Sequence, residues 1–214
     1  MTDRTALRRF TSTSAEAPSA ATPTSAAKSL IDPAELARWL EDGAGPLGER
    51  WLASVRARDA SLGNGVEELL EGFFGVLLQL LPLTVGPMRT AAEALWVEVA
   101  GLFGSLAAQR GLAAGEVIEE FQILREALIR LLWASPPVEE PSGLALREVL
   151  RLNRVIDQGV THASVGHTDA LFFALFQGSG VPESLTDDAR YEIREQLQSL
   201  ETEVRTLQRA LKGR

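Results

Sequence analysis

The stretch 110–133, RGLAAGEVIEEFQILREALIRLLW, has the most regular helical pattern in the chain. Its apolar residues recur at alternating intervals of four and three, which predicts an amphipathic helix with one face turned to a core. That face consists of Val117, Phe121, Leu124, Leu128 and Leu131. Acidic residues, among them Glu120, stand in the first turns, an order that suits the helix dipole. Similar patterns follow along most of the chain, so we expect an all-α protein.

Arg125 interrupts this apolar face. With residues placed about 100° apart around the helix, it falls between Ile118 and Leu132. An unpaired buried charge is costly, so Arg125 needs a carboxylate or carbonyl partner, or a stem that lets its head reach water. Asp157, at the edge of the apolar face of a later helix, is a candidate partner. We expect Arg125 to fix the packing, with a signalling or ligand role as the alternative.

Composition narrows the classes of function. The 214 residues carry a formal net charge of −8 and contain no cysteine. The acidic balance disfavours general nucleic-acid binding, and the lack of cysteine excludes disulfides and thiolate sites. The longest apolar run, at 73–83, is too short to span a bilayer, and no secretory signal is recognisable. We therefore expect a soluble, cytoplasmic protein.

No catalytic or metal-binding motif stands out. The sequence has no nucleophile elbow, no Walker loop and no acidic cluster at metal spacing. The segment 43–48, GAGPLG, formally matches a GxGxxG phosphate loop, but a helix rather than a strand precedes it. We expect no enzyme activity, no cofactor and no metal.

Three segments are expected. Residues 1–29, rich in Ser, Thr, Ala and Pro, predict a disordered, slightly basic tail, with a docking arm as the alternative. Residues 30–180 predict a helical domain, which begins with Asp32 as N-cap, Pro33 as first helical residue and Glu35 completing a capping box. Residues 181–214 predict a separate C-terminal helix.

The expected helices of the central segment are separated by turns at 41–48, 61–65 and 135–143. Pro82 is expected to help end the third helix. Gly101, Gly104 and Ser105 are small enough to allow a close helix crossing. The predicted helices cover residues 33–40, 46–58, 66–81, 87–110, 110–133 and 144–177.

The helix predicted over 144–177 is apolar on more than one side. Such a helix is buried on more than one side, and in a chain of this size the second side favours contact with a second protomer. His162 would make that contact pH-sensitive, although a structural role is the favoured interpretation. His167, on the inner side, could ligate haem, but a hydrogen-bonded core histidine is favoured. The candidate dimer face consists of Val155, His162, Phe172, Phe173 and Phe176.

The last predicted helix, 184–212, has a narrower apolar seam with polar flanks. Its spacing of four and three continues without a slip, which is typical of the a and d positions of a coiled coil. We expect a parallel coiled-coil helix that pairs two copies of the chain. The alternatives are a helix that folds back onto its own core and a helix that binds a different protein. The seam consists of Ile193, Leu197, Leu200, Val204, Leu207 and Leu211.

Three motifs together resemble a known family. Residues 109–125, QRGLAAGEVIEEFQILR, resemble its R-x-G turn followed by E-[FY]-x-x-L-R. Trp51 followed by Val55, and the segment 153–160, NRVIDQGV, agree with two further helices. The chain is similar over about 36–176 to the N-terminal sensor domain of RsbT co-antagonist proteins, the RsbR-type stressosome sensors. Related domains also precede bacterial histidine kinases.

This resemblance implies a non-haem, globin-like helical domain that dimerises and continues into a helical linker. The chain departs from the family because no output domain, no H-E-[LF]-R box and no histidine at 101–110 is present. We expect either a stand-alone regulator or a truncated sensor. The expected function is a non-enzymatic, homodimeric module of bacterial signalling whose partner is another signalling protein. The alternatives are a structural adaptor and a haem-binding sensor.

Overall fold

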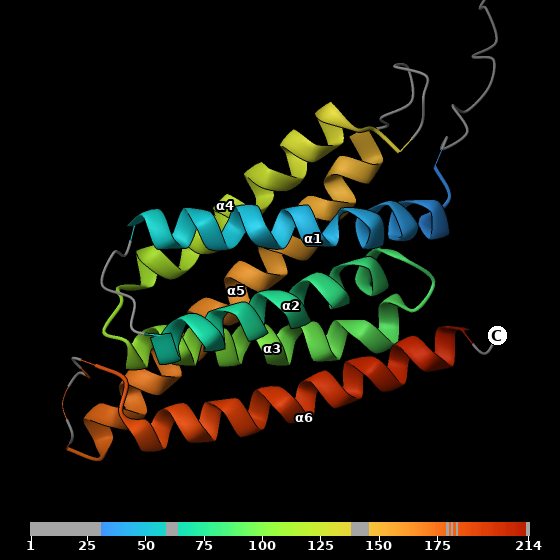
Figure 1. Cartoon of the computed structure of the whole chain (residues 1–214). Helices are drawn as coiled ribbons and strands as arrows, with labels where there is room; N and C mark the ends of the chain where they lie inside the picture. Colours follow the sequence, from blue (N-terminus) through green and yellow to red (C-terminus); the bar gives the residue numbers. More distant parts are fainter. Residues whose placement is uncertain are drawn as a thin grey trace, which may run out of the picture.

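The computed structural model describes residues 31–58, 64–137, 146–178, 180, 182 and 184–212, and these form six α-helices and no strand (Figure 1). The all-α prediction is confirmed. The tail predicted over 1–29 and most of the loops predicted over 61–65 and 135–143 lie outside the described residues. The helices are α1 (Pro33–Arg58), α2 (Asn64–Val85), α3 (Arg89–Gln109), α4 (Ala114–Ala134), α5 (Leu146–Phe176) and α6 (Asp187–Lys212).

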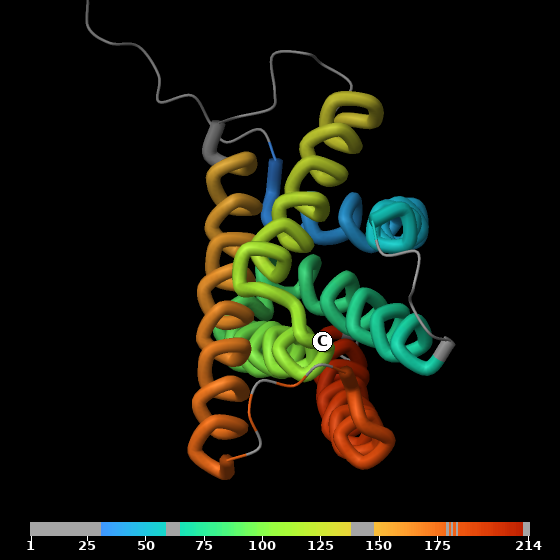
Figure 2. Tube along the Cα trace, turned by 90° about the vertical axis from the view of Figure 1, so that its left-hand side faces the viewer, coloured from blue at the N-terminus to red at the C-terminus, as the bar shows by residue number. Residues whose placement is uncertain are grey.

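Helices α2 and α3 form the centre of the fold. They pack against each other, α1 covers α2 from one side, and α6 lies along both from the other (Figure 1). α5 crosses α3 and runs along one whole side of the molecule, while α4 lies between α1 and α5 (Figure 2). This arrangement gives every described helix at least one buried face.

An aromatic cluster joins the first four helices. Trp51 of α1 stacks on Phe74 of α2 with ring centroids 3.9 Å apart. Phe103 of α3 meets Phe121 of α4 edge-on at 5.8 Å. Such pairs add to the stabilisation from burial because the edge of one ring is attracted to the face of the next. Phe121, Leu124 and most of the face predicted for the stretch 110–133 are buried here, so that prediction is confirmed.

The closest helix contact lies between α3 and α5. A Cβ atom on Gly104 would lie 1.8 Å from the carbonyl oxygen of Ala163, and one on Gly166 would lie 2.0 Å from that of Gly101. No side chain larger than hydrogen fits at these positions without separating the helices. The close crossing predicted at Gly101 and Gly104 is confirmed, and α5 is its partner.

The turn predicted at 41–48 is wrong, because α1 continues through Gly43, Gly45 and Pro46. The apolar residues on either side of the predicted turn lie on one helical face and pack against α2 and α4. That packing outweighs the poor helix propensity of glycine and proline. The GxGxxG match therefore lies inside a helix. The buried residues are Leu36, Ala37, Leu40, Leu47, Trp51, Leu52 and Val55.

The predicted start of α1 is confirmed, whereas the predicted end of α2 is wrong. At the start of α1, the Ala34 amide donates to Asp32 Oδ1 and the Asp32 amide donates to Glu35 Oε2, both at 3.2 Å, so Asp32 is the N-cap and Glu35 its reciprocal partner as predicted, with the Asp32 side chain bonded to the second helical amide. Pro82 does not end α2, which continues to Val85. Pro82 is itself buried, so packing holds the last turn of α2 in place.

The C-terminal helix does not leave the fold. Ile193, Leu197, Leu200 and Val204 are buried against α2 and α3 of the same chain, and Leu207 and Leu211 pack at the edge of the same core. The seam was identified correctly, but its partner is this chain's own core rather than a second copy. A coiled coil through these residues would require α6 to detach, and the coiled-coil prediction is not confirmed.

Two helical segments, Gly65–Val85 and Arg89–Gln109, are long and apolar enough to cross a membrane by length and composition. In their most apolar windows, 72% and 56% of the residues are buried inside the fold. Core helices of soluble proteins pass the same test, so this observation is weak evidence for a membrane span.

Candidate interaction surfaces

The ion pair predicted between Arg125 and Asp157 is present. Arg125 Nη2 donates to Asp157 Oδ1, which links α4 to α5. The stem of Arg125 lies in the apolar face, whereas Asp157 is mostly exposed, so the charged ends meet near solvent. Both expected ways of placing the Arg125 charge are therefore present: it has a carboxylate partner, and its stem carries the charged end outward.

Glu120 is buried where α1 ends against α4. Arg58 Nη2 donates to Glu120 Oε1 at 2.6 Å, and Arg58 Nη1 donates to Glu119 Oε2 at 3.2 Å. Burial raises the pKa of the Glu120 carboxyl, while the charges of Arg58 and Arg110 act to lower it. These contacts fit a joint between two helices.

His167 is buried on the inner face of α5. Its Nε2 lies 2.7 Å from the carbonyl oxygen of Leu112, in the turn between α3 and α4. A carbonyl oxygen can only accept, so Nε2 carries the hydrogen in this contact. The nitrogen that would bind a haem iron is therefore occupied by a structural hydrogen bond, as the favoured interpretation of a core histidine expects.

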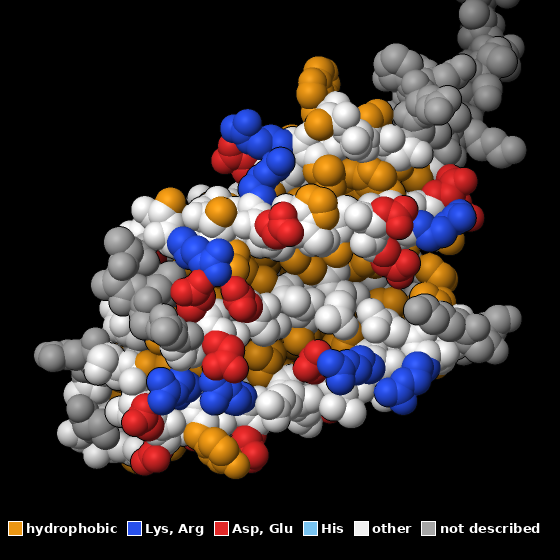
Figure 3. Space-filling model, viewed as in Figure 1, with side chains coloured by type: hydrophobic (Ala, Val, Ile, Leu, Met, Phe, Trp, Pro, Cys, Tyr) orange, Lys and Arg blue, Asp and Glu red, His pale blue; other side chains and the backbone are white. Residues whose placement is uncertain are grey.

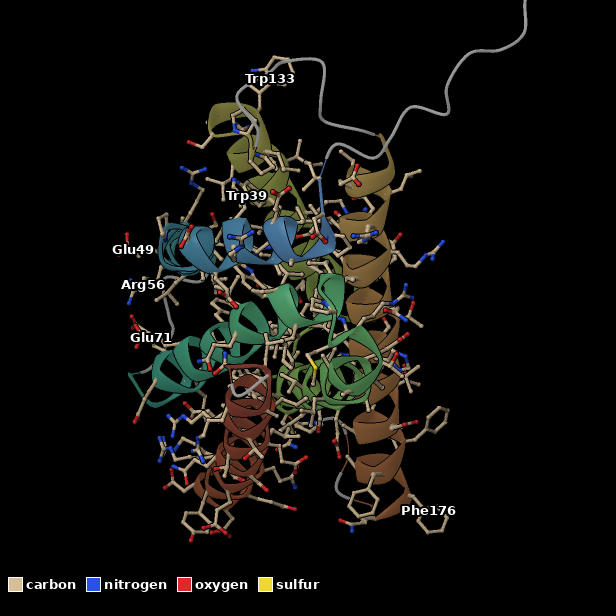
Figure 4. All side chains as sticks on the ribbon, turned by 90° about the vertical axis from the view of Figure 1, so that its right-hand side faces the viewer. Trp39, Glu49, Arg56, Glu71, Trp133 and Phe176 are labelled. Carbon is tan, nitrogen blue, oxygen red and sulfur yellow. The ribbon has the colours of Figure 1, made fainter. Side chains whose placement is uncertain are left out.

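The C-terminal end of α5 exposes three large aromatic side chains. Phe172 is 68%, Phe173 64% and Phe176 94% exposed, and Figure 4 shows Phe176 pointing away from the body of the protein. We call these three residues the aromatic end of α5. Val165, two to three turns earlier, is also half exposed. This is the part of the predicted dimer face that the fold leaves uncovered.

Val155 does not belong to that face. It shares a helical side with Phe173 but is only 5% exposed, and its carbonyl oxygen accepts a hydrogen bond from Trp96 Nε1 at 3.0 Å. The difference arises because α3 crosses α5. Trp96 of α3 covers the side of α5 that carries Val155, and beyond the crossing the same side is open.

Beyond the crossing, α3, α5 and α6 enclose an open groove of about 1070 Å³. α3 forms its floor, and α5 and α6 form its walls. His162 and Phe173 face it from α5, so His162 lies on the side predicted for it. We call this hollow the acidic groove, for the carboxylates that line it: Glu98, Asp169, Glu192 and Glu203.

The two flanks of α6 differ in charge. On the side towards α2, Arg194 donates to Glu68 at 2.8 Å, and Arg190 is bonded to Asp187. Along that face, basic and acidic side chains lie next to one another (Figure 3). On the groove side α6 presents Glu192 and Glu203. The described residues that line the groove include no Lys or Arg, so its negative charge is not balanced locally.

No protein family, curated protein or solved structure matches this chain. Among the residues that the structure describes, no group of three or more His, Cys, Asp and Glu could hold a metal ion.

The groove does not follow from the periodicity of any one helix. A signal was present, since Glu192, Gln196, Ser199 and Glu203 recur at intervals of three and four along one flank of the predicted C-terminal helix. In a sequence, such a polar stripe beside an apolar seam is equally typical of the solvated flank of a coiled coil. The groove depends on how far α5 stands from α6, and periodicity within one helix carries no information about that distance.

Proposed function

We propose that the chain is a non-enzymatic sensory or regulatory module that acts by binding proteins and that pairs with a second copy of itself. The observation that carries this proposal is the aromatic end of α5. Single exposed apolar residues are ordinary, but neighbouring exposed aromatic side chains on one regular helix are typical of a protein contact.

A symmetric contact between two copies fits this surface. In a two-fold dimer the same patch serves both protomers, so Phe172 and Phe176 of one copy can pack against those of the other. Full burial of a phenylalanine contributes about 1.5–3 kcal/mol. The aromatic ends of two protomers therefore bring a stabilisation of the same order as the entropic cost of association, about 4–15 kcal/mol.

The signalling role is supported by the resemblance to RsbR-type sensor domains. The segments that carry it, 109–125 and 153–160, are joined by the Arg125–Asp157 pair. Under this proposal the bundle corresponds to a globin-like sensor domain that works in the cytoplasm. Binding of a signal or a partner shifts helix packing, which another signalling protein detects.

α6 is the element best placed to relay such a shift. It packs mainly against α2 and α3 through one narrow seam. The chain reaches it through Gly178 and Gly180, both with φ of +73°. A helix held by one face moves as a unit more easily than a helix enclosed on all sides.

Sedimentation velocity over a range of concentrations tests the pairing. We expect wild-type chain to dimerise and the double variant Phe172→Ser/Phe176→Ser to be monomeric. Trp133→Ser is the matched control, because Trp133 is 89% exposed at the end of α4, far from Phe176 (Figure 4). A wild-type monomer at all concentrations, or a dimer that survives the double substitution, would contradict the proposal.

A further inference from the structure

We propose that the acidic groove binds a basic amphipathic helix of a partner protein. This inference names the partner of the module proposed above and so rests on that function. It uses a surface that meets the aromatic end of α5 only at Phe173.

The shape of the groove fits a helix. α3 packs against both α5 and α6, whereas α5 and α6 hardly touch each other. Figure 2 shows the two walls standing apart below α3. The layer beneath α3 therefore has two helices with an open position between them, and a further helix lying along α3 would fill it.

The length of the groove sets the length of the ligand. Its lining extends over residues 97–109 of α3 and residues 189–203 of α6. At 1.5 Å per helical residue, these stretches span about 18 and 21 Å. A partner helix of about 12–14 residues matches them, which is a common size for helices that bind in a groove.

The floor and inner walls suit the apolar side of such a helix. Half-buried Leu102 and exposed Phe173 offer contact for apolar side chains. Small residues between them let the backbone of a partner approach closely. These are Gly101, Ser105, Ala170 and Ala174.

The charge of the groove selects a basic partner. Glu98 projects from the floor, Asp169 from the α5 wall, and Glu192 and Glu203 from the α6 wall. Lys and Arg on the flanks of a bound helix would find carboxylates on each side, which favours encounter and fixes orientation. Nucleic acid and anionic lipid would be repelled. A second copy of this chain, with a net charge of −8, offers the wrong sign as well.

Occupation of the groove would act directly on α6. A helix bound there touches the flank of α6 that carries Glu192 and Glu203, beside the seam that holds α6 to the core. Partner binding would thus bias the element that we propose as the relay.

The test uses the full chain and a fluorescent model peptide, with Leu at positions i, i+3, i+4 and i+7 and Lys on both flanks. We expect binding by anisotropy, and no binding of the same peptide with Glu in place of Lys. The groove variant Glu98→Gln/Asp169→Asn/Glu203→Gln should weaken binding about tenfold or more, because three ion pairs to the peptide are lost.

Two further variants control for charge and for shape. Glu41→Gln/Asp42→Asn/Glu49→Gln removes the same three charges from exposed positions of α1 and should leave binding unchanged. Ser199→Trp places a bulky ring in the groove from an exposed position of α6 and should abolish binding without changing charge. Equal binding of the acidic peptide, equal effects of the two triple variants, or full binding by Ser199→Trp would overturn the proposal.

One more variant tests whether the chain's own N-terminal segment competes for the groove. If Arg4→Gln/Arg8→Gln/Arg9→Gln raises peptide affinity, that segment occupies the groove, which overturns assignment to a partner.

Sedimentation of the same samples shows whether the partner proposal and the dimer proposal stand or fall separately. The groove variants should remain dimeric. If the wild-type chain is a dimer but does not bind the peptide, the proposal of a basic partner helix is rejected and the dimer proposal stands. If the wild-type chain binds the peptide but is a monomer, the dimer proposal is rejected and the partner proposal stands.

Discussion

Arg58 Nη2 donates a hydrogen bond to Glu120 Oε1 over 2.6 Å, which joins the C-terminal end of α1 to the buried face of α4. Glu120 is 6% exposed, and burial raises the pKa of its carboxyl despite the nearby charges of Arg58 and Arg110. By hydrogen-bond geometry its second oxygen, Oε2, is buried without a partner in the described part of the chain, and among the groups that lower the pKa of the carboxyl Arg58 has the largest effect and Trp51 the smallest. The ionised carboxylate thus depends strongly on Arg58.

Arg58→Ala should therefore destabilise the protein in a pH-dependent way. Because its pKa is raised, folded Glu120 holds its proton to higher pH than unfolded Glu120. Its ionisation thus lowers stability as pH rises above the ordinary value of 4.5. Removing Arg58 enlarges this loss. We expect Arg58→Ala to lower the free energy of unfolding by about 1–3 kcal/mol at neutral pH and by less in mildly acidic solution. Urea unfolding at the two pH values measures this difference.

Arg56→Ala is the control for Arg58. Arg56 pairs with Glu67 and Glu71 on the surface of α2, with its side chain half exposed (Figure 4). Exposed pairs contribute about 0–1 kcal/mol, so this variant should lose little at either pH. A pH-independent loss in Arg58→Ala would show that Glu120 does not need the cation.

The Arg125–Asp157 pair should show measurable but modest coupling. Asp157 is largely exposed, so water screens the pair. A double-mutant cycle of Arg125→Ala and Asp157→Ala should give a coupling energy of about 0.2–1 kcal/mol. Strictly additive losses would mean that the contact does not stabilise the junction of α4 and α5.

Gly104→Ala should be severely destabilising. Its Cβ would lie 1.8 Å from a backbone oxygen of α5, so α3 and α5 would have to separate. We expect a loss of about 3 kcal/mol or more in thermal or urea unfolding, at the upper end of overpacking effects. Gly75→Ala is the matched control, since a Cβ there meets nothing within 4 Å. It should gain up to about 1 kcal/mol from better helix propensity.

The packing of α6 can be separated from dimerisation by working in the Phe172→Ser/Phe176→Ser background. In that chain, Leu197→Ala should lower the free energy of unfolding by about 2–5 kcal/mol, because it leaves a cavity against the core. The unfolding midpoint should not depend on protein concentration, because the contact lies within one chain. Gln198→Ala, at the exposed neighbouring position, should change stability by less than about 0.5 kcal/mol. A concentration-dependent midpoint would point to a coiled coil between chains.

Helical periodicity was sufficient to predict the fold class and most of the helices. The face of α4 and the N-cap at Asp32 followed from patterns within single helices, and the position of Arg125 inside an apolar face showed that it needed a partner such as Asp157. These features depend on local geometry that every helix shares. Local signals failed at Pro46 and Pro82, where tertiary packing keeps both residues inside longer helices.

The sequence does not predict which element packs against each helical face. The seam from Ile193 to Leu211 has the spacing of a coiled coil, but a core made of α2 and α3 satisfies it equally well. In the same way, Val155 and Phe173 share one side of α5, and only the path of α3 determines that the first is buried and the second exposed. The groove is a further consequence of helix placement.

The central position of α2 and α3 affects how the chain is made. These two helices, whose composition would suit a bilayer, are synthesised before α5 and α6, which cover them. During translation the emerging chain therefore exposes about forty apolar-rich helical residues with only α1 available to shield them. Chaperones that hold unfolded chains, and machinery that recognises nascent membrane spans, would both encounter this segment before α5 and α6 cover it. The 26 residues of α6, which pack against both helices, are synthesised after them.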